Sequence, residues 1–339
     1  MTILASELKP YYAVDMSDLS TSGGRPRPAS VDYLITSGAL QNVFPHIFRA
    51  KRVAGCLDDP QHRKIIWRNC NAAGETLFAP GTYLFRPNPS DAWVWKVIGT
   101  MRSTKADLTG SEAMYGPGLL NAAVIATATV LVVNVKHTRM TGCFAVGRPT
   151  RIADKATVTA SGNEEEFIPS DVAIVGTQLT ITIPAPGLAN GYAAGATVFS
   201  VYYPSAGELE CSVDNWSETT DTYNEAAAPV IGDNIGSDEQ TWTFQKLTAT
   251  TFSCTGDTLG TLTTIGSTAT DYAPVNPENS KPYFTLYAAG WLGELPDGYT
   301  LVFQTHPPCL PVHEFREWPP LVNSFAGDGI TSVLEGETA

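Results

Sequence analysis

The chain has 339 residues, of which 43% are hydrophobic and only 16% are charged, with 29 glycines and 24 prolines. This length allows two or three domains with buried cores, and low charge with many turn formers suits strands better than exposed helices. The net charge of −13 is unevenly placed, because residues 1–115 carry 13 Lys or Arg against 10 Asp or Glu, whereas residues 116–339 carry 8 against 24. The acidic later part argues against binding of nucleic acid.

Neither a signal peptide nor a membrane span is expected. The N-terminal sequence MTILASELKPYYAVDMSDL has no basic region followed by an apolar stretch. A transmembrane helix needs 18 or more apolar residues in a row, and the longest apolar run, residues 119–135, is interrupted by Asn and Thr. That run predicts one or two buried strands.

Residues 1–30 predict an extended N-terminal arm. The stretch STSGGRPRPAS contains a Gly pair, Pro26 and Pro28, which fit neither a helix nor a central strand. Two alternatives stay open for this arm. One is a disordered tail, and the other is an arm that orders against a neighbouring subunit through apolar anchors such as Leu8 and Tyr11.

Residues 31–115 predict a mixed α/β domain. The sequence VDYLITSGALQNVFPHIF has helical spacing at its start and a stop at Pro45, whereas KIIWRNC, GTYLFRPN and DAWVWKVIGTM are typical of strands.

The rest of the chain predicts strands throughout. Residues 116–204 indicate a β-barrel or sandwich, in which VGTQ (175–178) is a turn between two strands, and residues 205–315 indicate a second β-sandwich. Residues 316–339 predict an exposed C-terminal tail with one apolar clip at 330–334. The expected fold class is therefore mainly β, with an N-terminal mixed α/β region, two β-sandwich or barrel-like domains and extended terminal arms.

The acidic stretch DNIGSDEQTWTFQ (233–245) is the first candidate cation site. Its acidic and amide residues do not match the alternate ligand spacing of an EF-hand, and Gly236 suits a turn that feeds a strand. The turn hypothesis predicts that Trp242 and Phe244 lie on the buried face of that strand. It also treats Asp238 as a surface residue whose replacement by Asn costs less than about 0.5 kcal/mol.

Two further clusters are weighed as metal sites and not favoured. Glu164, Glu165 and Glu166 follow one another, and neighbours on a strand point to opposite faces, so a solvated hairpin tip is the preferred interpretation. The sequence HPPCLPVH (306–313) has H-x2-C-x3-H spacing, but its prolines impose an extended path that separates the ligands.

The six cysteines contain no C-x-x-C pair, which disfavours a zinc ribbon. Buried free thiols are the default interpretation. Disulfides in an assembled particle are the alternative, and the candidate cysteines are Cys56, Cys70, Cys211 and Cys254.

No nucleophile elbow, papain-like cysteine signature or P-loop is present in the sequence. We therefore expect no enzymatic activity, no catalytic, cofactor-binding or metal-binding residues, and no cofactor. Paired carboxylates of a glycan hydrolase, which meet in space rather than along the chain, remain a less favoured possibility.

Several motifs resemble structural proteins of tailed bacteriophages and prophages. They are TSGGRPRP, MYGPGLL, GNEEEF, SVDNW, DNIGSDEQTWTF and the region from NPENSKPYFTLYAAGW to YTLVFQTHP, and the resemblance covers most of residues 110–307. It implies a virion-associated protein built from strands and turns, with no functional residues to carry over. Sheath, neck, collar, baseplate and fibre attachment all remain open as its location.

These observations lead to a non-enzymatic structural subunit of a phage tail, neck or baseplate, assembled in the host cytoplasm into the virion. Its expected partners are copies of itself in a ring or helical array and other virion proteins, without nucleic acid and without membrane insertion. The alternative is a host-surface glycan-binding or fibre-attachment module, with Trp216, Trp242 and Trp291 as a stacking platform. Burial of these tryptophans in a core is the favoured outcome.

Overall fold

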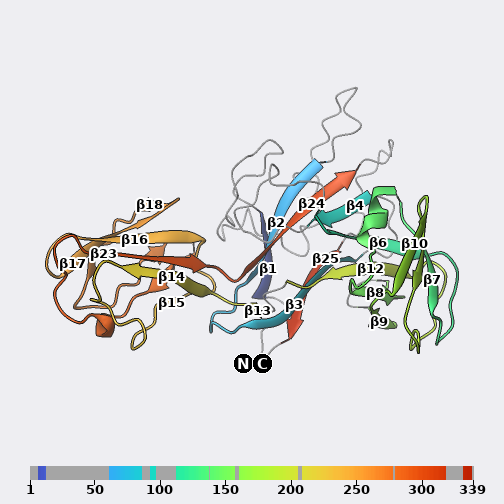
Figure 1. Cartoon of the computed structure of the whole chain (residues 1–339), viewed down its shortest axis with the longest axis horizontal. Coiled ribbons are helices and arrows are strands. Elements are labelled where there is room, and N and C mark those ends of the chain that lie inside the picture. The colour runs from blue at the N-terminus through green and yellow to red at the C-terminus, as the bar shows by residue number, and fades with distance from the viewer. Residues whose placement is uncertain are drawn as a thin grey trace, which may run out of the picture.

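The computed structural model describes residues 7–12, 61–85, 92–96, 112–136, 138–156, 160–204, 208–277, 279–317 and 331–337. Over these ranges the chain forms β-strands and short 3₁₀ helices, with no α-helix, which confirms the mainly β class. Two lobes lie at opposite ends of a central region (Figure 1). We call them the 117–202 lobe and the 212–306 lobe.

The central region contains a five-stranded sheet made from segments far apart in the sequence. Its order is β1 (Leu8–Tyr12), β2 (Gln61–Asn69), β24 (Cys309–Glu317), β4 (Ala92–Lys96) and β5 (Met114–Tyr115). The described part of the predicted N-terminal arm is thus a strand, which pairs antiparallel with β2 of its own chain.

A ten-stranded sheet runs from the central region into the 117–202 lobe. Its main path is β10 (Asp171–Val175), β11 (Gln178–Thr182), β7 (Val130–Asn134), β6 (Pro117–Leu120), β12 (Thr197–Tyr202), β3 (Leu77–Phe85) and β13 (Glu208–Leu209). Strand β25 (Thr331–Glu337) pairs with β3, and β8 (Thr150–Ala153) pairs with β12 and with β9 (Glu164–Phe167). The 3₁₀ helix η3 (Thr138–Cys143) precedes β8.

The 212–306 lobe has a six-stranded sheet and two small ribbons. The large sheet holds β14 (Ser212–Glu218), β23 (Thr300–His306), β16 (Gln240–Lys246), β17 (Thr251–Gly256), β18 (Gly260–Thr261) and β19 (Gly266–Ser267). The ribbons are β15 (Ile231–Gly232) with β22 (Phe284–Thr285) and β20 (Val275–Asn276) with β21 (Lys281–Pro282), and the 3₁₀ helix η4 spans Ala288–Gly290.

Each lobe buries its own core. The core of the 117–202 lobe is mostly aliphatic, with Leu131, Leu179 and Ile181 fully buried. The core of the 212–306 lobe is aromatic, and Phe284 and Phe303 meet there edge to face at 5.2 Å between ring centroids. The alternation of apolar and polar residues along each strand explains both cores, because successive side chains point to opposite faces.

The predicted division into domains along the sequence is not supported. The described part of residues 31–115 contains strands and connecting turns but no helix, and the segment expected to start as a helix, residues 31–48, lies outside the described residues. The predicted 205–315 domain also loses its last strand, because β24 leaves the lobe and pairs with β2. Likewise β25, from the predicted exposed tail, pairs with β3. Pairing between distant segments leaves no local pattern, which is why the sequence did not reveal it.

Within the described ranges, the structure has no helix of the length and apolarity needed to cross a membrane.

Candidate functional site

The acidic loop of residues 233–239 lies where the 212–306 lobe meets the central region. Asp233 closes its first turn, because its carboxylate accepts hydrogen bonds from the backbone N–H groups of Ile235 (2.8 Å) and Gly236 (2.7 Å). The Ser237 hydroxyl donates to the carbonyl of Tyr283 (2.7 Å) and accepts from the N–H of Asp233 (3.0 Å). The loop is therefore a closed turn bonded within its own lobe.

Arg68 of β2 binds the same loop from the central region. Its side chain is 3% exposed, its Nε donates to the carbonyl of Asn234 and its Nη2 donates to the carbonyl of Ser237, each over 2.7 Å. The amide of Asn234 donates in return to the carbonyl of Glu75 (3.2 Å). A buried guanidinium with two directed hydrogen bonds fixes both the position and the angle of the loop relative to β2. We call this set of contacts the Arg68 junction.

Glycine is required at position 236 by close packing. A Cβ atom there would lie 2.0 Å from the carbonyl oxygen of Pro282, well inside van der Waals contact. The amides of Asn276 and Asn279 bind the neighbouring carbonyls of Gly236 (3.0 Å) and Ile235 (2.8 Å). The loop carbonyls that a cation would need are thus already hydrogen-bonded inside the chain.

These contacts confirm that residues 233–239 form a turn feeding a strand. In β16, Trp242 and Phe244 are fully buried, while Thr241, Thr243 and Gln245 lie on the more exposed side. The expectation for Asp238 was wrong, since it is 2% exposed and its backbone carbonyl accepts a hydrogen bond from Thr305. Across the described part of the chain, no group of three or more His, Cys, Asp and Glu residues is placed to hold a metal ion.

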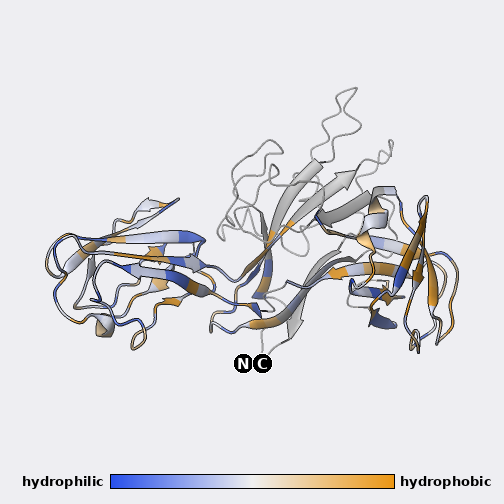
Figure 2. Cartoon of the chain, in the orientation of Figure 1, coloured by the Kyte–Doolittle hydropathy of each residue, from blue (hydrophilic) through white to orange (hydrophobic). Residues whose placement is uncertain are grey.

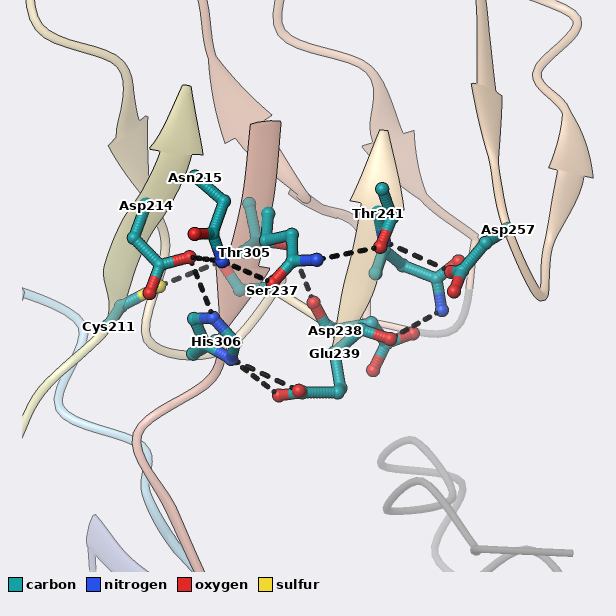
Figure 3. Close-up of polar contacts among 12 residues, drawn as sticks. Cys211, Asp214, Asn215, Ser237, Asp238, Glu239, Thr241, Asp257, Thr305 and His306 are labelled. Atoms are coloured by element: carbon teal, nitrogen blue, oxygen red, sulfur yellow. Dashed lines mark hydrogen bonds and ion pairs between the residues drawn. The ribbon is translucent and has the colours of Figure 1, made fainter. Parts of the chain in front are cut away.

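A histidine between two carboxylates lies beside the junction (Figure 3). His306 ends β23, and its Nδ1 lies 3.0 Å from both carboxylate oxygens of Glu239 while its Nε2 lies 3.1 Å from Oδ1 of Asp214. Asp214 lies in β14, His306 ends β23, and Glu239 directly precedes β16, and these three strands are neighbours in the sheet. The hydrogen bond to Glu239, more than any other contact, raises the pKa of His306 to about 9. The imidazolium form therefore links the three strands at neutral pH.

Asn215 extends this polar cluster across the sheet. It has a positive φ of 51° at an irregularity in β14, and its amide donates to Asp214 (3.0 Å) and to Gln304 (2.7 Å). Gln304 donates in turn to the hydroxyl of Thr241 (3.3 Å). The contacts of Asn215 with Gln304, of Gln304 with Thr241 and of His306 with its two carboxylates each join neighbouring strands, so this cluster ties the sheet together.

We call His306 and its two carboxylates, Asp214 and Glu239, the His306 clamp. This clamp predicts that the free energy of unfolding depends on pH. The pKa of His306 is about 9 in the folded chain and about 6.5 for a free histidine, so its contribution is complete below about pH 6.5 and is lost as the pH rises through about 9. With a third of its side chain exposed, we expect His306→Gln to cost only about 1–2 kcal/mol near neutral pH. Urea unfolding of both proteins at about pH 6 and about pH 10 measures this. A cost that is equal at both pH values contradicts the clamp.

The three consecutive glutamates form β9 rather than a solvated hairpin tip. Glu164 and Glu166 point to one side, where they pair with Arg151 at 3.4 and 2.9 Å, and Glu164 also pairs with Lys155 at 2.6 Å. Glu165 points to the other side and accepts the backbone N–H groups of residues 189 and 190. The expected division between two faces is confirmed. The prediction of a solvated hairpin tip is wrong, because the glutamates lie in a strand that pairs with β8 and forms ion pairs with Arg151 and Lys155.

The HPPC segment separates its candidate ligands. His306 points to Asp214 and Glu239, whereas Cys309 begins β24 and packs against Ile66. The side chain of His313 lies outside the described residues.

Of the candidate disulfide cysteines, Cys211 and Cys254 are free thiols within this chain, Cys70 is buried, and Cys56 lies outside the described residues. Burial raises the pKa of Cys211 to about 11 and raises that of Cys254 further still. Thiols held protonated in this way are weak nucleophiles. Bridges between copies stay a prediction.

The three tryptophans of the proposed stacking platform are engaged in packing. Trp242 is fully buried, and Trp216 stacks on Phe303 with an interplanar angle of 8°. Trp291 packs edge to face against Tyr223 at 4.9 Å between centroids. Packing in the core, the favoured outcome, is confirmed for Trp242, and the other two pack against that core while partly buried.

Sequence reasoning missed Arg68 and His306 as site residues. The signal for Arg68 was a cation directly after the apolar run Ile-Ile-Trp of the strand sequence KIIWRNC, because a charge is buried only with directed partners. His306 had no comparable signal, because its two carboxylates are 67 and 92 residues away. Comparison with protein-family models, with curated proteins and with solved structures gives no match to this chain.

Proposed function

We propose that the chain is a non-enzymatic structural subunit of a tailed-bacteriophage virion, in the tail, neck, collar or baseplate. It assembles there with copies of itself into a symmetric oligomer and meets other virion proteins. The observation that carries this proposal is the Arg68 junction, because in it the polar loop 233–239 fixes one lobe to the central region. A subunit that transmits force or sets a spacing needs such a fixed connection.

The motifs that carry the resemblance to phage structural proteins form strands, the junction loop and part of a core. DNIGSDEQTWTF supplies the junction loop and the buried strand β16, and SVDNW supplies β14 with its irregularity at Asn215. PYFTLYAAGW adds Phe284 and Leu286 to the aromatic core. Residues of this kind determine the shape of the chain rather than a chemical site, which suits a structural subunit.

The glycan-binding alternative has weaker support. Its aromatic platform requires ring faces open to solvent, whereas Trp242 is buried and one face of Trp216 is stacked on Phe303. The indole N–H of Trp216 is also used, since it donates to Glu218 at 3.3 Å.

Sedimentation of the purified full chain over a wide range of concentration tests the proposal. We expect a defined oligomer, or a monomer that converts to one at high concentration, and no binding to a glycan array. A strict monomer that binds one glycan class, and loses that binding in Trp216→Ala, would contradict the structural role and favour the alternative.

A further inference from the structure

Strand β10 forms one edge of the ten-stranded sheet and lies in the right-hand lobe of Figure 1. Among the described residues it pairs with β11 alone, and the turn at 176–177 joins the two strands. Its sequence is Asp-Val-Ala-Ile-Val, with Ile174 51% and Val175 80% exposed. Figure 2 shows strongly apolar strands at this end of the molecule.

The hydrogen bonds of the next strand show which backbone groups of β10 face outward. The N–H of Val135 donates to Thr177 and that of Ile183 to Thr129, so the odd-numbered residues of β11 are bonded to β7. Because backbone groups alternate in direction along a strand, the even-numbered residues of β11 face β10 and bind its odd-numbered residues. Val172 and Ile174 therefore direct their N–H and C=O groups to the open edge.

The side chains at this edge also extend past the core. Val172 and Ile174 lie opposite Ile181 and Leu179, which are fully buried, so all four belong to the core face of the sheet. Ile174 is nevertheless half exposed, because no described strand lies beyond it to cover the core face. One more strand on this edge would cover it.

Another outer strand of the same sheet, β9, shows how an edge can be protected. It pairs with β8 alone among the described residues and carries Glu164, Glu165 and Glu166. Charged side chains are a common device against unwanted strand pairing. Strand β10 has one charge, Asp171 at its first residue, and neither Lys nor Pro.

We propose that a second copy of this chain docks on β10, by antiparallel pairing of β10 with β10 about a two-fold axis at Ala173. In that register Val172 lies opposite Ile174 of the partner, and all four outward N–H and C=O groups of each strand are paired. Ala173 lies opposite Ala173, and Asp171 lies opposite Val175. The two Asp171 carboxylates are about 14 Å apart, farther than the Debye length of about 8 Å, so they repel little. This contact deepens the proposed function and rests on it, since it names one surface through which copies assemble.

A cysteine placed on the axis tests the register. Opposed residues of a non-hydrogen-bonded pair have Cα atoms about 4.5 Å apart, which suits a disulfide. We expect Ala173→Cys to form a covalent dimer with oxidised glutathione on non-reducing gels, at least tenfold faster than the unsubstituted chain. Val175→Cys is the matched control, because it is exposed on the same strand face but lies about 14 Å from its counterpart in this register.

Two substitutions at Ile174 test whether the backbone hydrogen bonds of β10 contribute to self-association. Ile174→Pro removes an outward N–H that β11 does not use, whereas Ile174→Ala keeps that N–H although it removes more of the side chain than Pro does. We expect Pro to weaken self-association at least tenfold more than Ala in sedimentation, with unchanged near-UV circular dichroism. Equal effects of Pro and Ala, or equal crosslinking at 173 and 175, overturn the inference.

The same measurements separate this inference from the proposed function. A chain that assembles in sedimentation but fails both β10 tests keeps its structural role and assembles through another surface. A chain that stays monomeric at every concentration overturns the β10 contact and contradicts the structural role as well.

Discussion

Trp242→Ala is expected to destabilise the 212–306 lobe by about 3–5 kcal/mol. The side chain is fully buried, and its ring packs against Phe284 at 5.0 Å and Tyr283 at 5.3 Å between centroids. Its Nε1 donates to the hydroxyl of Thr305 over 2.9 Å, so truncation leaves both a cavity and a buried hydroxyl with one partner fewer. Urea unfolding followed by circular dichroism measures the cost.

Thr305→Val is the control that separates the hydrogen bond from the volume. It keeps the side-chain size but removes two hydrogen bonds, the one from the Trp242 indole and the one to the carbonyl of Asp238, so we expect a cost of about 1–3 kcal/mol. If Trp242→Ala lowers the free energy of unfolding no more than this control does, the indole does not stabilise the core of the 212–306 lobe, and the account of that core is wrong.

Arg68→Met is expected to release the 212–306 lobe from the central region and to cost about 2–5 kcal/mol. Methionine fills much of the space but leaves the carbonyls of Asn234 and Ser237 without the two bonds of 2.7 Å that Arg68 supplies. Because those carbonyls belong to the connection rather than to the core of the lobe, the lobe itself should stay folded. Limited proteolysis should cut earlier near the junction, and X-ray scattering in solution should show a broader range of shapes.

Lys246→Met is the matched control, since it also replaces a cation by methionine. Lys246 pairs at 2.6 Å with Asp297, whose side chain is fully exposed, and such surface pairs contribute little. We expect this variant to match the unsubstituted protein in both measurements. Identical proteolysis of Arg68→Met and Lys246→Met would show that the junction does not hold the lobe.

Local patterns predicted much of the strand content and some of the local geometry. The alternation in residues 240–246 correctly placed Trp242 and Phe244 on the buried face, and the turn at 176–177 was correctly assigned to a hairpin. These features depend on neighbours in the sequence, so period-two alternation and turn chemistry are enough to find them.

Long-range pairing could not be predicted in this way. The joining of β2 to β24 brings Arg68 opposite Cys309, across 241 residues of chain, and no local signal selects that partner. The burial of Asp238 follows from the same closure, since the loop is enclosed between the central region and its own lobe. Acidic residues in a turn are usually exposed, and here tertiary packing overrides that tendency.

The most direct test of the structural role is quantitative mass spectrometry of purified phage particles from the host that encodes this chain. We expect the chain to be present in a fixed whole number of copies per particle, and electron cryomicroscopy of those particles to contain density that fits both lobes and their connection. A chain that is abundant in the lysate but missing from purified particles would contradict the account.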